Sequence, residues 1–261
     1  MGDLDNALQL RRVGPGLWAA YADPNYESAN GMFGGWTTAV ALRAVCDEAQ
    51  SDASACSLTI DFVSKIEPGS EVVIATRCVG EGRSVSFWQS ELKVADTTMA
   101  VASVVLTKRR ETDGHVGLTM PDAPNPSTLE LIFPAPAASG ERLGVRPVVG
   151  TPAHLEDCTY TAGWVRDLSG RTVDRLQLAL LSDHRAPRSF LWSDGPRPST
   201  TLTLSVYFHA TDEELASVGD DEILSEAFGT RGAQSTSEEH LRLWSRSGAL
   251  LATSVQMDWY R

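Results

Sequence analysis

Polar and apolar residues follow one order twice along this chain. In residues 1–108, apolar side chains recur with helical spacing from position 39 to 49, and the pattern predicts a helix over 36–50. Apolar and polar residues then alternate from Leu58 to Phe62, as in a strand with one buried face. Further strands are predicted at 72–79, 84–94 and 99–106.

The same order returns in residues 151–261. A strand is predicted at 155–166, and the spacing of Val173, Leu176 and Leu180 predicts a helix over 172–184. Alternating segments predict further strands at 201–208, 223–229, 237–244 and 250–259. Residues 57–60 also align with residues 201–204, so the order indicates an internal repeat related by a pseudo-twofold axis.

A proline-rich segment, residues 109–150, separates the two copies. It holds six of the 13 prolines, a density that disfavours both helix and sheet. We interpret it as a connector with a short helix near 127–132. The fold class predicted is α+β: two long helices, each wrapped by an antiparallel sheet, with the sheets joined edge to edge into one.

Composition and charge argue against several classes of function. The net charge of −12 argues against nucleic acid as a partner. No apolar stretch is long enough for a membrane span, and the acidic N-terminus does not look like a signal peptide, so we expect a cytoplasmic protein. The four cysteines have no CxxC spacing and the five histidines are scattered, so we expect neither a metal nor a cofactor.

Several motifs carry a family resemblance. Asn30-Gly31-x-x-Gly34-Gly35 precedes the first helix, and Glu81-Gly82-Arg83-Ser84 lies between two strands. Leu181-Ser182-Asp183, Thr201-Leu202 and Ala252-Thr253-Ser254-Val255-Gln256 follow in the second copy. Together they resemble the double hotdog acyl-CoA thioesterases, in particular acyl-CoA thioesterase II.

The resemblance implies an N-terminal hotdog (1–108), the connector (109–150) and a C-terminal hotdog (151–261). It implies an acyl-CoA thioesterase of fatty acid metabolism that acts on an acyl-CoA substrate without a cofactor and forms a homo-oligomer. Asp183, Thr201 and Gln256 match the positions of that family's catalytic set.

The residues themselves support this chemistry in part. Asp183 continues the apolar face of the predicted second helix, and both burial and the C-terminal helix dipole would raise its pKa, as a general base near neutral pH requires. The pattern alone equally allows an exposed aspartate at a frayed helix end. Thr201, on a polar row with Thr203 and Ser205, and Gln256 on the last strand are ordinary strand residues unless they meet Asp183.

A thioesterase also needs an oxyanion site and substrate contacts. Gly34 and Gly35 at a helix N-terminus could present N–H groups to an oxyanion, or could simply allow a tight turn. Arg83 is a candidate for CoA phosphates, and Trp36 for an apolar acyl groove. Other candidate cations are Lys65, Arg109 and Arg110, and other candidate groove residues are Phe33, Trp88 and Phe190.

We expect one active site. In the first copy Ser57 stands at the place of Thr201 and Leu106 at that of Gln256, and only Asp47 and Glu48 offer an acid in the helix. The alternative is a catalytically silent hotdog protein that binds an acyl or acyl-CoA ligand. A hydratase of the same fold would need an Asp and His pair that we do not find.

Overall fold

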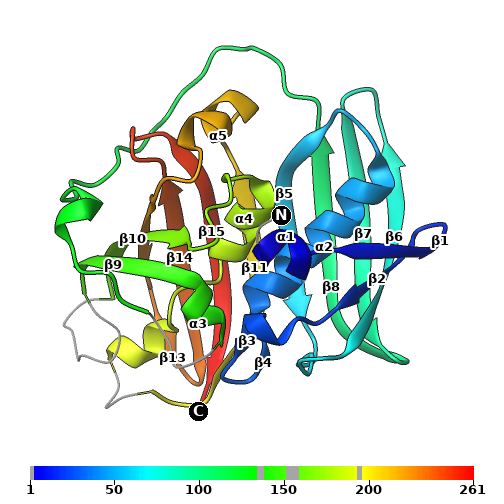
Figure 1. Cartoon of the computed structure of the whole chain (residues 1–261), viewed down its shortest axis with the longest axis horizontal. Helices are drawn as coiled ribbons and strands as arrows, with labels where there is room; N and C mark the ends of the chain where they lie inside the picture. Colours follow the sequence, from blue (N-terminus) through cyan, green and yellow to red (C-terminus); the bar gives the residue numbers. More distant parts are fainter. Residues whose placement is uncertain (1–2, 134–137, 151–158, 193–195) are drawn as a thin grey trace.

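The computed structural model describes residues 3–133, 138–150, 159–192 and 196–261 (Figure 1). In the first half the elements are α1 (Asp3–Ala7), β1 (Leu10–Gly14), β2 (Leu17–Tyr21), η1 (Pro24–Tyr26), β3 (Glu27–Ser28), β4 (Gly31–Met32), α2 (Gly34–Ala49), β5 (Ser54–Phe62), β6 (Glu71–Glu81), β7 (Val85–Val94) and β8 (Thr97–Thr107). They continue with η2 (Pro126–Thr128), α3 (Ala138–Arg142), β9 (Leu143–Val149), β10 (Thr161–Asp167), α4 (Arg175–Leu181), η3 (Arg188–Leu191), β11 (Ser199–Phe208), α5 (Asp212–Val218), β12 (Ile223–Phe228), β13 (Gly232–Ala233), β14 (Thr236–Trp244) and β15 (Leu250–Tyr260).

One antiparallel sheet runs through both halves. Its order in the described residues is β1-β2-β6-β7-β8-β5-β11-β15-β14-β12-β10-β9, with β13 paired to β14. The halves join where β5 pairs with β11, with Leu204 opposite Ile60. Because this junction pairs the two edges, neither is left open. The prediction of a double hotdog with one joined sheet is confirmed.

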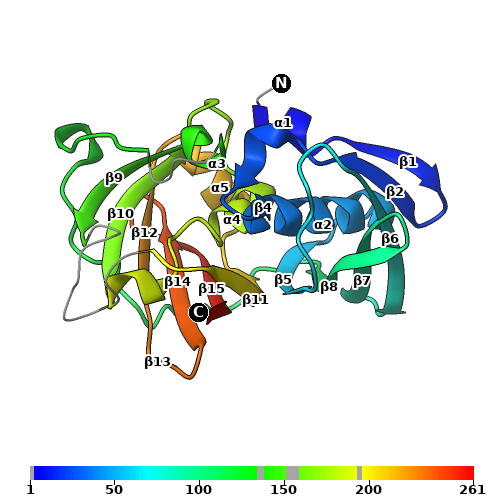
Figure 2. The same ribbon diagram turned by 90° about the horizontal axis from the view of Figure 1, so that it is seen from below.

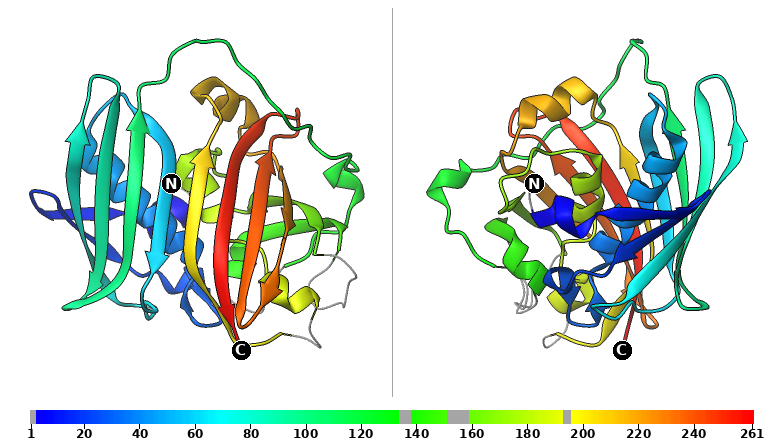
Figure 3. Two further views of the ribbon diagram at one scale, coloured as in Figure 1. Left: turned by 180° about the vertical axis from the view of Figure 1, so that it is seen from behind. Right: turned by 45° about the vertical axis from the view of Figure 1, so that its right-hand side comes forward.

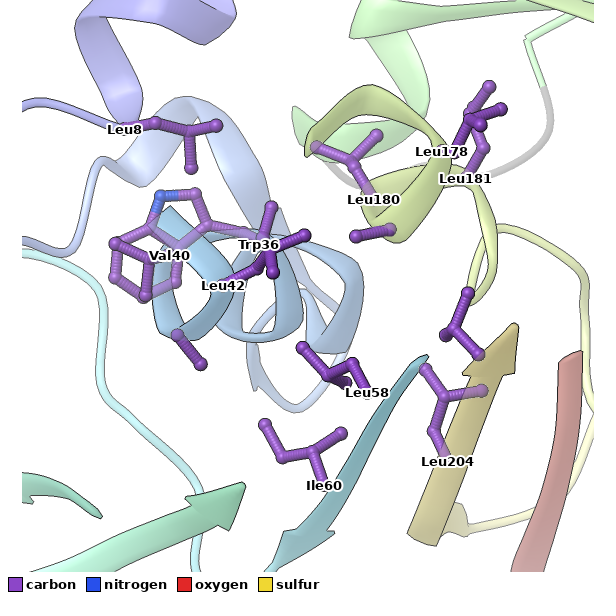
Figure 4. Packing of buried hydrophobic residues seen from close by; sticks show 14 of the residues in the cluster. Leu8, Trp36, Val40, Leu42, Leu58, Ile60, Leu178, Leu180, Leu181 and Leu204 are labelled. Atoms are coloured by element: carbon purple, nitrogen blue, oxygen red, sulfur yellow. The ribbon is translucent and has the colours of Figure 1, made fainter. Parts of the chain in front are cut away.

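Helix α2 forms the centre of the first half. Small residues at 39, 41 and 44 are fully buried, so the helix packs closely on all sides. Its leucine and valine side chains meet Leu58 and Ile60 of the sheet, and Leu180 of α4 lies beside them (Figure 4). Both helices lie on the same side of the sheet (Figure 2). This places the end of α4 against the start of α2.

The second helix is shorter than predicted. The pattern indicated 172–184, but α4 covers only Arg175–Leu181. The Asp174 side chain accepts a hydrogen bond from the N–H of Gln177 and so begins the helix there. Beyond Ser182 the chain turns toward Pro187, which a helix interior excludes. Asp183 therefore lies in the turn after the helix, not on its face.

The prediction of a connector without regular structure was wrong for residues 138–149, where Ala138–Arg142 forms α3 ahead of a strand. Leu143–Val149 forms β9, which pairs with β10 at the edge of the sheet. An edge strand tolerates Pro147 because one side of its backbone needs no partner strand. The short helix expected at 127–132 is a single turn, η2. Residues 108–133 cross from β8 to the far edge of the second half (Figure 1).

The elements that precede α2 were not predicted. Strands β1 and β2 extend the sheet beyond β6, and α1 packs its Leu4 and Ala7 into the core. The predicted strand at 155–166 is β10 from Thr161 onward, and its first residues lie partly outside the described residues. Across the described part of the chain, no helix combines the length and apolar character of a membrane span.

Candidate active site

Asp183 meets the N-terminus of α2. The N–H of Gly35 donates a hydrogen bond to its carboxylate, and Thr201 Oγ1 donates to its Oδ1 at 3.4 Å. A Cβ atom at Gly34 would lie 2.5 Å from Asp183 Oδ2, and one at Gly35 would overlap the carbonyl oxygen of Leu180. Two glycines are therefore required here, because they let the turn after α4 approach the backbone of α2.

A β-bulge turns Thr201 toward Asp183. In the pairing of β11 with β15, Thr201 lies opposite Asp258 and Thr203 opposite Met257, so Leu202 is an extra residue. The bulge moves Thr201 to the inner face, and Leu202 is 39% exposed on the outer one. The predicted polar row was therefore wrong, because Thr201 does not share a face with Thr203 and Ser205.

Alternation along β15 brings Gln256 and Asp258 to the same inner face. Both are buried, at 4% and 1% exposure, whereas Met257 between them is exposed. Gln256 Nε2 donates to Asp258 Oδ1 at 3.5 Å, and the Thr201 hydroxyl also bonds Asp258. Thr201 thus contacts Asp183 directly, while Gln256 reaches this cluster through Asp258.

Asp258 was missed by the sequence reasoning. The signal was available, because the face that contains Ser254 and Gln256 continues to position 258 at the same period of two. Glu239 was missed as well. It lies opposite Gln256 on β14, is 1% exposed, and forms an ion pair of 2.5 Å with Arg188.

Burial controls the protonation of these groups. Burial, then the neighbouring charges of Asp258 and Glu239, raise the pKa of Asp183 to about 8, against the hydrogen bonds from Gly35 and Thr201. Burial and Glu239 raise the pKa of Asp258 to about 7. Burial and Arg185 lower the pKa of His184 to about 3, so this imidazole is neutral.

Burial raises the pKa of Asp183 as predicted, but the helix contribution differs from the predicted one. The helix end that contacts the carboxylate is the N-terminus of α2, through the hydrogen bond from the Gly35 N–H. This contact lowers the pKa of Asp183. Burial and the charges of Asp258 and Glu239 raise the pKa by more than this contact lowers it. The Gly35 N–H, expected to face an oxyanion, is bonded to Asp183 in this structure.

Trp36 and Arg83 lie apart from this cluster. Trp36 is 0% exposed, and its indole N–H donates to the Ala7 carbonyl at 2.9 Å, so it is a core residue between α1 and α2 (Figure 4). Arg83 is exposed in the turn between β6 and β7, which lies beside Thr107. Thr107 pairs with Ser54, the first residue of β5, whereas Phe62 is the last residue of that strand. The turn that holds Arg83 is therefore at the opposite end of β5 from Phe62.

The other candidate cations are engaged elsewhere. Lys65 pairs with Glu67, Arg110 donates to Ser84 Oγ, and Arg109 donates to the carbonyls of Phe208 and His209. Arg109 thereby connects the connector to the second half. Of the other groove candidates, Phe33 alone caps α2 beside this site, and its ring lies against Gly35.

The first half lacks a matching set. A bulge at Cys56 places Ala55 opposite Leu106 on the inner face, as the bulge at Leu202 places Thr201 opposite Asp258. By this register Ala55, not Ser57, corresponds to Thr201, and Leu106 corresponds to Asp258. Glu48 accepts hydrogen bonds from Arg12 and Trp18 instead. Apolar residues thus fill the first half's counterpart of the site.

Comparisons with known proteins identify the family of this chain. The sequence model described as "Acyl-CoA thioesterase N-terminal domain" matches residues 22–107, and "Acyl-CoA thioesterase C-terminal domain" matches residues 118–257. A search of curated proteins gives no match.

Solved structures share the fold over the whole chain. A conserved protein of unknown function with hot dog fold from Alicyclobacillus acidocaldarius is 27% identical, with a TM-score of 0.95 over 100% of this chain and 98% of that one. A putative thioesterase II from Thermobifida fusca YX is 21% identical, with a TM-score of 0.84 over 100% and 98% of the two chains. The tesB protein of Mycobacterium avium subs paratuberculosis is 22% identical, with a TM-score of 0.83 over 99% and 98%. With both domain models matched in order, this chain belongs to the acyl-CoA thioesterase family.

Proposed function

We propose that this protein hydrolyses an acyl-CoA to the free acid and CoA, with Asp183 as the general base. The main support is the position of Asp183: a partly buried carboxyl group with a raised pKa, in contact with the Thr201 hydroxyl and the N-terminus of α2. A base whose pKa lies near the working pH combines basicity with a substantial ionised fraction. Thr201 and Gln256 would orient the water.

The proposed reaction has two proton transfers. Asp183 takes a proton from water as the water oxygen forms a bond to the acyl carbon, and the carbonyl oxygen becomes an oxyanion. The positive end of α2, at Gly34 and Gly35, favours that charge. The C–S bond then breaks, and the proton on Asp183 passes to the departing thiolate. The products are a carboxylic acid and CoA with a free thiol.

The test is release of free thiol from a panel of acyl-CoAs of short, medium and long chain. Cys46, Cys56 and Cys78 are free thiols, so a reading without substrate must be subtracted. Asp183→Asn is the variant that we expect to be inactive. Asp61→Asn is the matched control, because Asp61 is exposed on the outer face of β5. Saturable binding of acyl-CoA without thiol release from any substrate would favour the silent binding protein instead.

We also propose a homo-oligomer in the cytoplasm. None of the helices that the structure describes lies on the outer face of the sheet (Figure 3). Its exposed large apolar side chains include Leu202, Tyr207, Met257 and Trp259. A second copy could cover them, since a contiguous apolar patch favours association. Light scattering coupled to size exclusion would give the mass, and a monomer at all concentrations would contradict the proposal.

A further inference from the structure

Building on the proposed hydrolase function, we propose that Asp258 is a positioning residue of the active site. It shares a single proton with Asp183, and the Thr201 hydroxyl lies between the two carboxyl groups. Asp258 would act on the reaction only through the protonation and orientation of Asp183.

The hydrogen-bonding capacity of Thr201 supports a shared proton. Its hydroxyl contacts both Asp183 and Asp258, but a hydroxyl has only one hydrogen to donate. It can give one of the two carboxyl groups a full hydrogen bond and at most share that hydrogen with the other, so the second carboxyl group is poorly stabilised as an anion. Asp258 Oδ2 is buried and has no protein partner in the described residues, and an unpartnered buried oxygen favours the neutral, protonated form of this carboxyl group.

The charges around the two carboxyl groups also indicate that they hold one proton. The charged groups that face the pair are the guanidinium group of Arg188 and the carboxyl group of Glu239, and Arg185 acts on the pair only through Glu239. His184 after α4 is neutral, and His240 of β14 acts on the pair only through Glu239. Three carboxyl groups thus accompany two cations in this largely buried cluster, in which Arg188 forms an ion pair with Glu239. One proton makes the cluster neutral, which burial favours.

Shared protonation would set how the rate depends on pH. Two interacting carboxyl groups lose their protons in separate steps that belong to the pair. While Asp258 is ionised, its charge opposes the ionisation of Asp183 and holds the base protonated to higher pH. Removing that charge without changing the side-chain shape should let Asp183 ionise at lower pH.

The experiment compares Asp258→Asn with the wild-type protein and with the control Asp61→Asn. The acidic limb of kcat/KM against pH should move to lower pH by about one unit or more in Asp258→Asn. At alkaline pH its rate should stay within about tenfold of wild type, because the base remains. A limb that stays at the wild-type pH, as in Asp61→Asn, would overturn the proposal.

A second readout needs no substrate. The infrared carbonyl band of protonated carboxyl groups should titrate near neutral pH in the wild-type protein and at lower pH in either Asp258→Asn or Asp183→Asn. An unchanged titration in both variants, or no such band in the wild type at pH 6, would contradict the shared proton. Because this band is independent of turnover, its result stands even if no acyl-CoA is hydrolysed. If Asp258→Asn does not fold, Asp183→Asn still reports on the pair.

Discussion

The carboxylate of Asp183 occupies the space that a side chain at Gly34 would need: a Cβ atom there would lie 2.5 Å from Asp183 Oδ2. The two residues come from different halves of the chain. The close approach is possible only because Gly34 has no side chain and the turn after α4 is held against α2. The proposed base, in the second hotdog, thus packs against the central helix of the first.

Gly34→Ala should therefore reduce activity through geometry alone. The added methyl group displaces the Asp183 carboxylate, and a shift of about 1 Å in a catalytic group can cost on the order of 10²-fold in rate. Thiol release from the best acyl-CoA measures the effect. Gly114→Ala is the control, because a Cβ atom at Gly114 meets nothing within 4 Å. Equal rates for the two variants would contradict the contact with Asp183.

Asp183→Asn should lower turnover by about 10²- to 10⁴-fold, the usual contribution of a general base. The amide keeps the shape but cannot accept the proton, so acyl-CoA affinity should change little. Thr201→Val and Gln256→Ala should each cost less. Either of them combined with Asp183→Asn should be scarcely worse than Asp183→Asn, because all three act on one water. Fully additive losses in the double variants would show that they act separately.

The unfolding free energy should reveal the raised pKa of Asp183 without substrate. The folded protein keeps a proton on this group between its ordinary pKa of 3.8 and about 8, whereas the unfolded chain has lost it. Its contribution to stability is full below pH ~4. That contribution decreases as the pH rises toward about 8, by up to ~1.4 kcal/mol per pH unit.

Asp183→Asn removes this dependence. Urea unfolding at pH 5 and pH 8 should show the variant gaining stability relative to wild type at the higher pH. The same difference at both pH values would mean that Asp183 titrates normally. Circular dichroism before unfolding verifies that both proteins are folded at each pH.

Trp36→Ala should damage the core and not the choice of substrate. Because the indole is fully buried and bonded to Ala7, its loss should cost about 3–5 kcal/mol of stability, the usual range for a buried aromatic residue. Trp36→Phe keeps most of the packing and should cost less. A shift in preferred acyl-chain length with unchanged stability would instead restore Trp36 to the substrate groove.

Local pattern alone predicted α2, most of the strands and the antiparallel order. This succeeded because an element with one buried face repeats its apolar residues at its own period, as from Leu58 to Phe62 in β5. Asp258 could have been found by the same alternation, one step beyond Gln256 on β15. The exposed strand β1 and the edge strand β9 have weaker alternation, so the pattern did not reveal them.

The tertiary structure decided how the site is assembled. A bulge is a relation between two strands, so no period along β11 could show that Leu202 is extra and that Thr201 faces inward. Nor could the sequence show which end of the sheet holds Arg83, or that Trp36 is directed toward α1. The contact of Asp183 with Gly34 and Gly35 joins residues far apart in the chain. It exists because packing of α4 on α2 brings them together, and packing depends on the whole fold and not on local spacing.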